Sequence, residues 1–388
     1  MKISADWLSK PSTQLIMQIL LSGGHEAFFV GGCVRNALFD LKATDIDIST
    51  SATPKRVMEL MNQAGLTTIP TGIDYGTVTV VSEKQNYEIT TFRKDIETDG
   101  RRAKVKFSGS VLEDAKRRDF SINAIYSEQD GTILDPLNGI VDIAKKRVKF
   151  IGDPYARIKE DYLRILRFFR FLALFGREDE THEIEIAAIR DLRDGLDTIS
   201  AERKSDEILK LFAAPNPQYS IVLMEAADIS SKIFDAYNYN SLNNLRELED
   251  RLEVTPCATR RLAAYTEDNL KSKLRFSNRI AKAHKILREE AGSKKDPAEL
   301  SYRYNDKLAL DSILVRSSLH SIELNDGVFS RIKLGSAVKF PIKSVDLAEY
   351  FSGRKLGEML ACLEQKWIDS DFALSKQTLI STIKYKRK

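Results

Sequence analysis

The chain has 388 residues, of which 43% are hydrophobic and 30% are charged, and its formal net charge is +4. A chain of this length exceeds one core, so we expect two or more domains. No apolar run approaches the length needed to cross a bilayer, so we expect a soluble protein with no membrane contact. The three cysteines, Cys33, Cys257 and Cys362, form no CxxC pair. This pattern argues against a disulfide framework or a zinc site and favours a reducing cytoplasm.

The N-terminal part predicts an α/β head. Short apolar runs such as "AFFVGG", "TVTVV", "YEITTF" and "TILDP" alternate with helical patterns such as "TPKRVMELMNQAG". From about residue 153 long amphipathic stretches follow one another, beginning with "DPYARIKEDYLRILRFFRFLALFG". The predicted fold is therefore an α/β head, with a small mixed sheet and helices, followed by an elongated all-α part.

The run "VGGCVRN" predicts a strand that ends at Gly31 and Gly32, followed by a helix that carries Arg35 in its first turn. Glycines at such a turn let the backbone approach a phosphate, and the helix start offers free N–H groups to it. Arg35 is placed to add a bidentate phosphate contact. The glycine pair alone is a weak signal, but it precedes the next motif by about a dozen residues.

That motif is "DIDIST", in which Asp45 and Asp47 are two residues apart in a strand pattern. Residues i and i+2 of a strand share a face, so both carboxylates project together and favour a hard cation such as Mg²⁺ between them. Such a pair can hold two metal ions for in-line attack at phosphorus. Glu88 in "YEITTFR" is our candidate for a third ligand or a base. The alternative is that these acids are solvated or paired with basic residues.

Several motifs occur together in one order: "GGCVRNALFDLKATDID", "TTFRKD…DGRR", "EDAKRRDFSINAIY", "LDPLNGIVDI" and "KEDYLRILRFFRF". In order and spacing they resemble the class II tRNA nucleotidyltransferases, the CCA-adding enzymes, whose close relatives include bacterial poly(A) polymerases. "SAERKSDEILKL" resembles the family's next motif, and the C-terminal part resembles the tails of some bacterial members. The resemblance implies a catalytic nucleotidyltransferase head over 1–150, a base-recognising neck over 151–215, and a tRNA-binding body and tail over 216–388. Two positions depart from the family pattern, with Asn36 where Asp is usual and Asp40 where Gly is usual.

The neck motif "EDYLRILRFFR" carries the expected base selection. On one continuous helix, Arg157, Glu160, Asp161, Arg164 and Arg167 would fall within about 120° of one face. Cytosine and adenine both present an amino donor beside a ring-nitrogen acceptor, which a carboxylate and an arginine match. By resemblance, Asp161 and Arg164 read the base, while Arg167 and Arg170 lie near the nucleotide. The alternative is an ordinary amphipathic helix with a salt-bridged solvent face.

Other charged segments are assigned by resemblance and by charge. Arg118 in "KRRDFSINA" is expected to contact the triphosphate or the ribose, and Asp119 beside it could simply pair with a neighbouring arginine. A loop around Gly100 and Arg101 is expected to be mobile and favours full CCA addition. Nine Lys and Arg residues between 257 and 288, Arg260 and Arg261 among them, and the terminal "KYKRK" predict RNA phosphate contacts. The residues assigned to RNA binding are Arg275, Arg279, Lys282 and Lys285.

The resemblance implies attack by a tRNA 3′-hydroxyl on the α-phosphate of CTP or ATP, with release of pyrophosphate and the help of two Mg²⁺ ions. The expected partners are the tRNA acceptor arm, CTP and ATP, and no obligate protein partner is evident. The near alternatives are a poly(A) polymerase and an enzyme that adds only CC or only A. An RNA-binding protein with an inactive head is the alternative from another class.

Overall fold

A computed structural model describes residues 1–43, 45–99, 102–325 and 327–383. The chain divides into two compact units. The first comprises residues 1–239 with 256–258 and 270–276, and the second comprises 240–255, 259–269 and the residues from 277 onward. Each unit has its own packing and is described by itself. Among the described residues, no helix is both long and apolar enough to cross a membrane.

The first unit is built on a seven-stranded sheet in the order β3-β4-β5-β2-β1-β8-β9. β2 and β5 pair in parallel, whereas the other neighbours pair antiparallel. The sheet is therefore mixed, as the sequence predicted. Its strands are β1 (Ala27–Val30), β2 (Ile46–Thr50), β3 (Thr67–Gly72), β4 (Thr77–Ser82), β5 (Gln85–Thr91), β8 (Tyr126–Ser127) and β9 (Ile133–Leu134).

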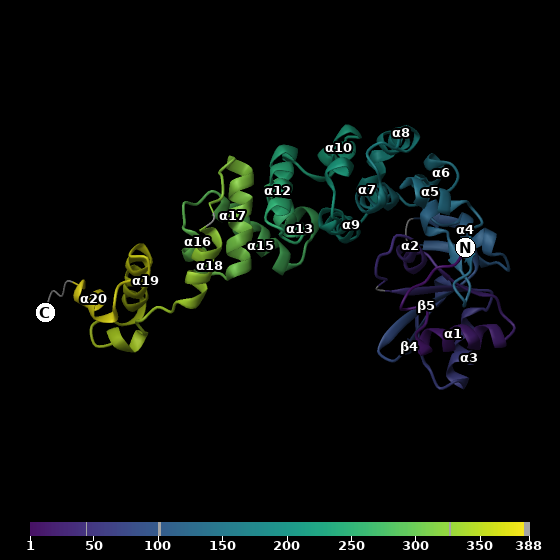
Figure 1. The fold of residues 1–388 in the computed structure, drawn as a ribbon, viewed down its shortest axis with the longest axis horizontal. Helices are drawn as coiled ribbons and strands as arrows, with labels where there is room; N and C mark the ends of the chain where they lie inside the picture. The colour runs from purple at the N-terminus through teal and green to yellow at the C-terminus, as the bar shows by residue number, and fades with distance from the viewer. Residues whose placement is uncertain (44, 100–101, 326, 384–388) are drawn as a thin grey trace. The chain divides into compact units, whose positions relative to one another are not determined.

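The two faces of strands β2, β4 and β5 differ in polarity. Ile48, Val80 and Ile89 point to one face and are fully buried. Helices α1 (Pro11–Ser22) and α3 (Pro54–Gln63) cover that face (Figure 1), and the Tyr87 hydroxyl lies 2.9 Å from the Ser12 hydroxyl of α1. Because side chains alternate along a strand, the acidic residues of β2 and β5 point to the opposite face. Because α1 and α3 bury the apolar face, the acidic residues are left on the opposite, polar face of the sheet.

A two-stranded sheet of β6 (Arg93–Asp99) and β7 (Arg102–Phe107) follows β5. The predicted loop at Gly100 and Arg101 lies outside the described residues, but the segments beside it are paired strands. The other helices of the first unit are α2 (Gly32–Leu38), η1 (Ile73–Tyr75), α4 (Val111–Lys116), η2 (Ser121–Asn123), α5 (Gly139–Lys145), α6 (Pro154–Glu160), α7 (Leu163–Phe175), α8 (Glu183–Leu192), η3 (Arg193–Thr198), α9 (Ala201–Ala213), α10 (Gln218–Ala226), α11 (Ile229–Ile233) and α14 (Leu270–Leu274).

The stretch predicted as one helix from Asp153 is two helices, α6 and α7, and the prediction of a continuous helix is wrong. Asp161 separates them with an extended backbone, φ −156° and ψ 105°. Its carboxylate accepts a hydrogen bond from the Leu163 N–H at 3.1 Å, which caps the start of α7. Asp competes with helix continuation by such local bonds, so the break needs neither Gly nor Pro.

The second unit is helical in its described residues. Its elements are α12 (Tyr239–Arg251), α13 (Ala258–Tyr265), α15 (Asn278–Ala291), α16 (Pro297–Arg303), α17 (Asp306–His320), α18 (Val328–Ala337), η4 (Ser344–Leu347), α19 (Gly353–Asp369) and α20 (Lys376–Ser381). One apolar cluster forms around Leu300 and Ile313, and another around Trp367 and Leu379. α16 and α18 cross so closely that a Cβ on Gly335 would lie 1.9 Å from the Ala298 carbonyl oxygen, so only glycine fits there.

Candidate active site

Three acids meet at the polar face of the sheet. Asp47 of β2 and Glu88 of β5 are register partners in the parallel pair, so their side chains stand next to each other on one face. Asp45 directly precedes β2. We call Asp45, Asp47 and Glu88 the acidic row. The sequence placed these residues together by strand alternation, and the register of β2 with β5 agrees.

The acidic row is electrostatically unfavourable without a cation. The pKa of Asp47 is raised from 3.8 to about 6, first by burial and then by the charge of Glu88, with a further contribution from Asp45. Arg118 opposes this shift only in part. A bound cation would relieve the same repulsion. No three Asp, Glu, His or Cys side chains in the described part of the chain already stand close enough to share one ion.

The glycine turn lies against the acidic row. Gly31 has φ +72°, and a Cβ on it would lie 3.6 Å from Asp47 Oδ2 and 3.4 Å from Arg118 Nη1. A side chain at this position would be strained and would crowd both groups. The backbone at Gly31 therefore comes close to Asp47, whereas Gly32 lies beside the Arg35 side chain. At Asp40, where the family usually has Gly, φ is +55°, a conformation that Asp tolerates.

Arg118 is half-buried and fixed from several sides. It donates to Asp114 Oδ2 and to the Ser49 hydroxyl, both at 3.1 Å, and to the Tyr126 hydroxyl at 3.2 Å. Burial disfavours the charged guanidinium, but Tyr126 and Asp114 stabilise it more strongly, so the pKa of Arg118 is raised. Arg157, in turn, donates to the carbonyl oxygens of Arg117 and Arg118. A rigid cation thus stands beside Asp47 and Gly31, and Arg157, predicted only as part of a polar helix face, supports it.

Arg35 sits in an aromatic and amide cradle. Its guanidinium carbon lies 4.6 Å from the centre of the Phe175 ring and 5.1 Å from that of Phe171. Nη1 donates to Asn123 Oδ1 at 2.6 Å, and Nη2 donates to Asn36 Oδ1 at 2.8 Å. Burial, with Arg170 nearby, lowers the pKa of Arg35 to about 10. Asn36, the departure from the family pattern, therefore holds Arg35 through a neutral oxygen.

Asp119 links the head to α7. Its carboxylate accepts from Arg167 at 2.5 Å and from Asn123 Nδ2 at 2.9 Å. The pKa of Asp119 is lowered although burial opposes this, because Arg167 and these hydrogen bonds favour the charged form. Asp119 thus does pair with an arginine, but with Arg167, 48 residues away, and not with the neighbouring arginine that the alternative named.

Arg167 and Arg170 also share an acid that sequence reasoning missed. Glu207 of α9 lies 2.5 Å from Arg170 Nε and 3.7 Å from Arg167 Nη1. Arg170 stacks 4.2 Å from the centre of the Phe171 ring. Arg170 was not among the residues predicted for the common polar face, yet it joins Arg167 in one network. Three arginines, including Arg35, therefore surround Phe171.

The base-reading pair has other partners in this structure. Asp161 Oδ2 accepts from Arg203 Nη2 at 2.6 Å. Arg164 donates to Glu160 at 2.5 Å and to the Arg157 carbonyl at 2.7 Å. Because the helix breaks at Asp161, the predicted common face for these side chains is wrong. Their place at the start of α7 still puts both polar groups beside the Asp119 network. Arg203 lies in "SAERKSDEILKL", whose charged positions were the only sequence signal for it.

The predicted RNA contacts divide between the units. Arg275 lies in the first unit, is 70% exposed and pairs with Glu202. Arg279, Lys282 and Lys285 of α15 lie in the second unit and are exposed. The terminal "KYKRK" lies outside the described residues.

Arg260 and Arg261 do not belong to a surface cluster, and that prediction is wrong. Both are buried, and Arg260 lies 2.6 Å from Glu249 and from Asp311 while Arg261 lies 2.7 Å from Glu249. We call these four residues the buried ion network. It uses the two arginines inside the second unit.

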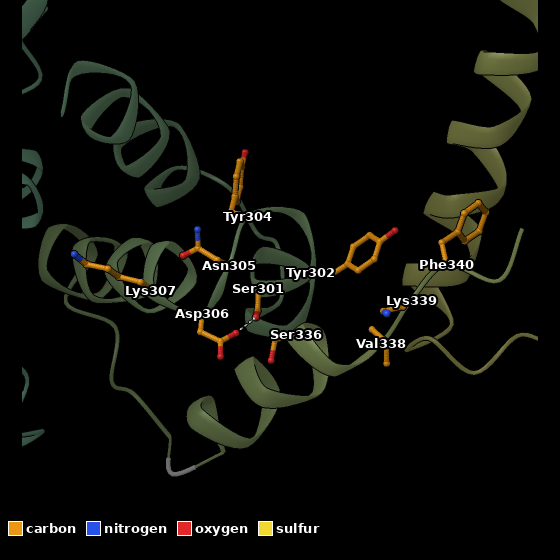
Figure 2. Close-up of a pocket in the computed structure, with 11 residues that line it drawn as sticks. Ser301, Tyr302, Tyr304, Asn305, Asp306, Lys307, Ser336, Val338, Lys339 and Phe340 are labelled. Atoms are coloured by element: carbon orange, nitrogen blue, oxygen red, sulfur yellow. Dashed lines mark hydrogen bonds between the residues drawn. The ribbon is translucent and has the colours of Figure 1, made fainter. Parts of the chain in front are cut away.

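A hollow of about 770 Å³ in the second unit does not resemble a catalytic site (Figure 2). Its lining includes Tyr302, Tyr304, Lys307 and Lys339. Asp306, which also lines it, accepts a hydrogen bond from the Ser301 hydroxyl at 2.6 Å. An acid already bonded in this way, among hydroxyls and lysines, gives no cation site comparable with the acidic row.

The chain resembles known nucleotidyltransferases in sequence and in fold. Residues 27–149 match the family described as the poly A polymerase head domain, and residues 184–239 match the "Probable RNA and SrmB- binding site of polymerase A". The mitochondrial CCA tRNA nucleotidyltransferase 1 of Mus musculus is 31% identical over 95% of this chain and 89% of its own length. The CCA-adding enzyme of Leuconostoc citreum is 41% identical over 59% of this chain and 56% of its own length. The crystal structure of the Bacillus stearothermophilus CCA-adding enzyme with CTP is 25% identical, with a TM-score of 0.75 over 96% of both chains.

Proposed function

The chain belongs to the family of CCA-adding tRNA nucleotidyltransferases, and from this premise we propose that it adds C, C and A to the 3′ end of tRNA from CTP and ATP. The reaction is attack by the 3′-hydroxyl on the nucleotide α-phosphate, with release of pyrophosphate. The observation that carries the proposal is the juxtaposition of the acidic row with Gly31 and Arg118. It joins a cation site to a phosphate site on one face of the sheet.

The family uses divalent metal ions, and we propose Mg²⁺, with Asp45 and Asp47 as ligands and Glu88 as a further ligand or base. Two such ions, when bound, activate the attacking hydroxyl and stabilise the charge that develops on the phosphoryl group. The oxygen ligands and the raised pKa of Asp47 fit a hard cation at this place. Gly31, Gly32, Arg35 and Arg118 are proposed to hold the triphosphate and the ribose. Their partners fix them before the nucleotide arrives, which lowers the ordering cost of binding.

We propose that Asp161 and Arg164 choose the base, with Arg167 and Arg170 nearby. The pattern that cytosine and adenine share needs one acceptor and one donor, which the two side chains supply. In this structure Arg203 pairs with Asp161, and Glu160 pairs with Arg164. Base binding would therefore exchange these partners rather than fill empty positions.

Recognition of tRNA is assigned to charge on the helical part. Exposed Arg275, Arg279, Lys282 and Lys285 are proposed to contact RNA phosphates, which suits recognition by shape. The division into head 1–150, neck 151–215 and body with tail 216–388 is part of the same proposal.

We also propose that the protein works in the cytoplasm. The support for this is that its three cysteines are free.

The test is to incubate the protein with tRNA that lacks its 3′ end, with each nucleotide alone and with all together, and to sequence the products. Two C residues with CTP alone, followed by one A once ATP is present, are the expected result. A long A tail would instead assign the protein as a poly(A) polymerase, whose head family the chain also matches. No incorporation with any divalent ion would leave RNA binding as its only activity.

A further inference from the structure

The polar face of the sheet continues beyond the acidic row as a surface of hydroxyl groups. Thr79 is the register partner of Glu88, and Thr77 is the partner of Thr90, which lies two residues beyond Glu88 on β5. By strand alternation all of them share the face of Asp47. Thr71 of β3 joins them, because its hydroxyl lies 2.6 Å from that of Thr79. We call Thr71, Thr77, Thr79 and Thr90 the hydroxyl shelf.

The shelf is an ordered set of neutral groups. The Thr77 and Thr90 hydroxyls lie 3.0 Å apart, so each pair holds its rotamers in place while keeping further donor or acceptor capacity. Thr71 is exposed, Thr77 and Thr90 are partly exposed, and Thr79 is buried beneath Thr71, to which it is bonded. α3 packs against the same three strands from the opposite face, where the Thr68 hydroxyl donates to Asn62 of that helix. The shelf itself faces the side on which the chemistry takes place.

The position of the shelf follows from the direction of attack. In the sheet order β4-β5-β2-β1, Gly31 and Arg118 lie on the β1 side of Asp47, whereas the shelf lies on the β5 and β4 side. In-line displacement places the attacking oxygen opposite the leaving pyrophosphate. With the triphosphate beside Gly31 and Arg118, the nucleotide that carries the attacking hydroxyl must come from the side of the shelf.

The chemistry of the shelf suits a ribose. Threonine hydroxyls both donate and accept, as does the 2′-hydroxyl that distinguishes RNA from DNA. Being neutral, they do not add charge beside three carboxylates. Ile69, 43% exposed and paired with Thr79 across β3 and β4, adds an apolar surface on the same face for the attached base.

We propose that the hydroxyl shelf binds the terminal ribose of the RNA through its 2′-hydroxyl and so positions the attacking 3′-hydroxyl at the acidic row. This inference rests on the proposed function, because it needs an RNA 3′ end as the acceptor. It assigns an acceptor-strand contact to Thr90, with the buried Thr79 holding the Thr71 hydroxyl in place, and none of these side chains carries a charge.

The experiment compares acceptor RNAs that end in ribose or in 2′-deoxyribose, both of which keep the 3′-hydroxyl. The double variant Thr79→Val/Thr90→Val removes two hydroxyls with little change of shape. On the ribose acceptor we expect kcat/KM to fall about fivefold, the effect of one lost neutral hydrogen bond, with KM for CTP unchanged. Wild type should lose about the same factor on the deoxy acceptor, and the variant should lose nothing further. Thr90→Ser should retain the preference for ribose.

Thr68→Val is the matched control, because it removes a bonded hydroxyl from the other face of β3 and should leave both acceptors unaffected. If the double variant unfolds, Thr90→Val alone carries the same comparison. The inference is overturned if the fall in kcat/KM caused by the double variant and the fall caused by the deoxy acceptor multiply when the two are combined. It is also overturned if the double variant behaves like Thr68→Val. Failure of the proposed function would look different, since wild type would then add no nucleotides even to the ribose acceptor.

Discussion

The acidic row and the buried ion network use charge in opposite ways. In the second unit, Glu249 and Asp311 are at most 5% exposed, and their carboxylates lie 2.6 Å from Arg260. Each charge in the network is paired with an opposite charge of the protein, so the network serves to stabilise the fold. In the head, Asp47 faces Glu88 and Asp45, and its pKa rises to about 6 because of burial and then because of these like charges. Asp47 thus stands beside like charges that Arg118 and Arg35 offset only in part, which is the arrangement expected of an acid that binds a cation.

The largest expected effect separates the two regions by activity. Asp45→Asn and Asp47→Asn each remove one oxygen anion from the acidic row, and we expect nucleotide transfer to fall by about a thousandfold or more. Single-turnover addition of labelled CTP measures the loss. Glu59→Gln, at an exposed pair with Arg56, is the control and should keep full activity. Substantial transfer by both aspartate variants would remove the acidic row from the mechanism.

The next effect falls on stability in the second unit. Glu249→Ala leaves Arg260 and Arg261 buried without their shared partner, which should cost about 3–5 kcal/mol of unfolding free energy. Trp367 lies in that unit and Trp7 in the first, so urea unfolding followed by fluorescence of a Trp7→Phe background reports on the second unit. Glu358→Ala, at an exposed pair with Arg354, should change stability by less than about 0.5 kcal/mol. Equal costs for the two variants would contradict the contrast.

A smaller effect of opposite sign is expected at Asp47 in metal-free protein. Its folded-state pKa of about 6 lies above the ordinary 3.8, so ionisation opposes folding at pH above 6. Asp47→Asn should therefore be more stable than wild type by about 1–3 kcal/mol at pH 7 to 8. The gain should shrink as the pH falls through 6 and vanish below about 4. Urea titrations with a chelator, repeated across this range, measure it, and a destabilised variant at pH 8 would show that Asp47 is compensated.

The smallest effect concerns Asp161, which is paired by Arg203 and thus lies between the two extremes. Asp161→Ala should weaken discrimination against UTP and GTP by about tenfold, because it removes the acceptor for the base amino group. Misincorporation on tRNA lacking its 3′ end measures this change. The divalent-ion dependence should stay that of wild type. A variant that keeps its base choice but loses its response to metal would place Asp161 elsewhere in the mechanism.

The sequence predicted those parts of the site whose geometry is local. Two-residue spacing placed Asp45 and Asp47 on one face, and alternation placed Glu88 on the face opposite Tyr87 and Ile89. Gly31 was predicted as a turn residue, and its positive φ agrees. The α/β head followed by helices could also be predicted from the sequence, because strand and helix periodicities differ over many residues.

The parts that could not be predicted depend on contacts distant in the sequence. The partner of Arg260 in α17 is 51 residues away, and Arg203 reaches Asp161 across 42. A count of basic residues cannot tell a buried arginine from an exposed one, so Arg260 was taken for part of a surface. The break at Asp161 was missed because it is marked by a side-chain hydrogen bond at the start of α7, rather than by Gly or Pro.

The parallel pairing of β2 with β5 also has a consequence for the order of folding. β4 and β5 are joined by a two-residue turn at Glu83 and Lys84, both with positive φ, so this hairpin closes locally. β2 reaches β5 only after the 34 or more intervening residues close a loop, which is slow to form. The acidic row therefore exists only once the non-local part of the sheet has closed. An incompletely folded chain keeps Asp47 and Glu88 apart, so catalytic competence in this protein also reports completed folding.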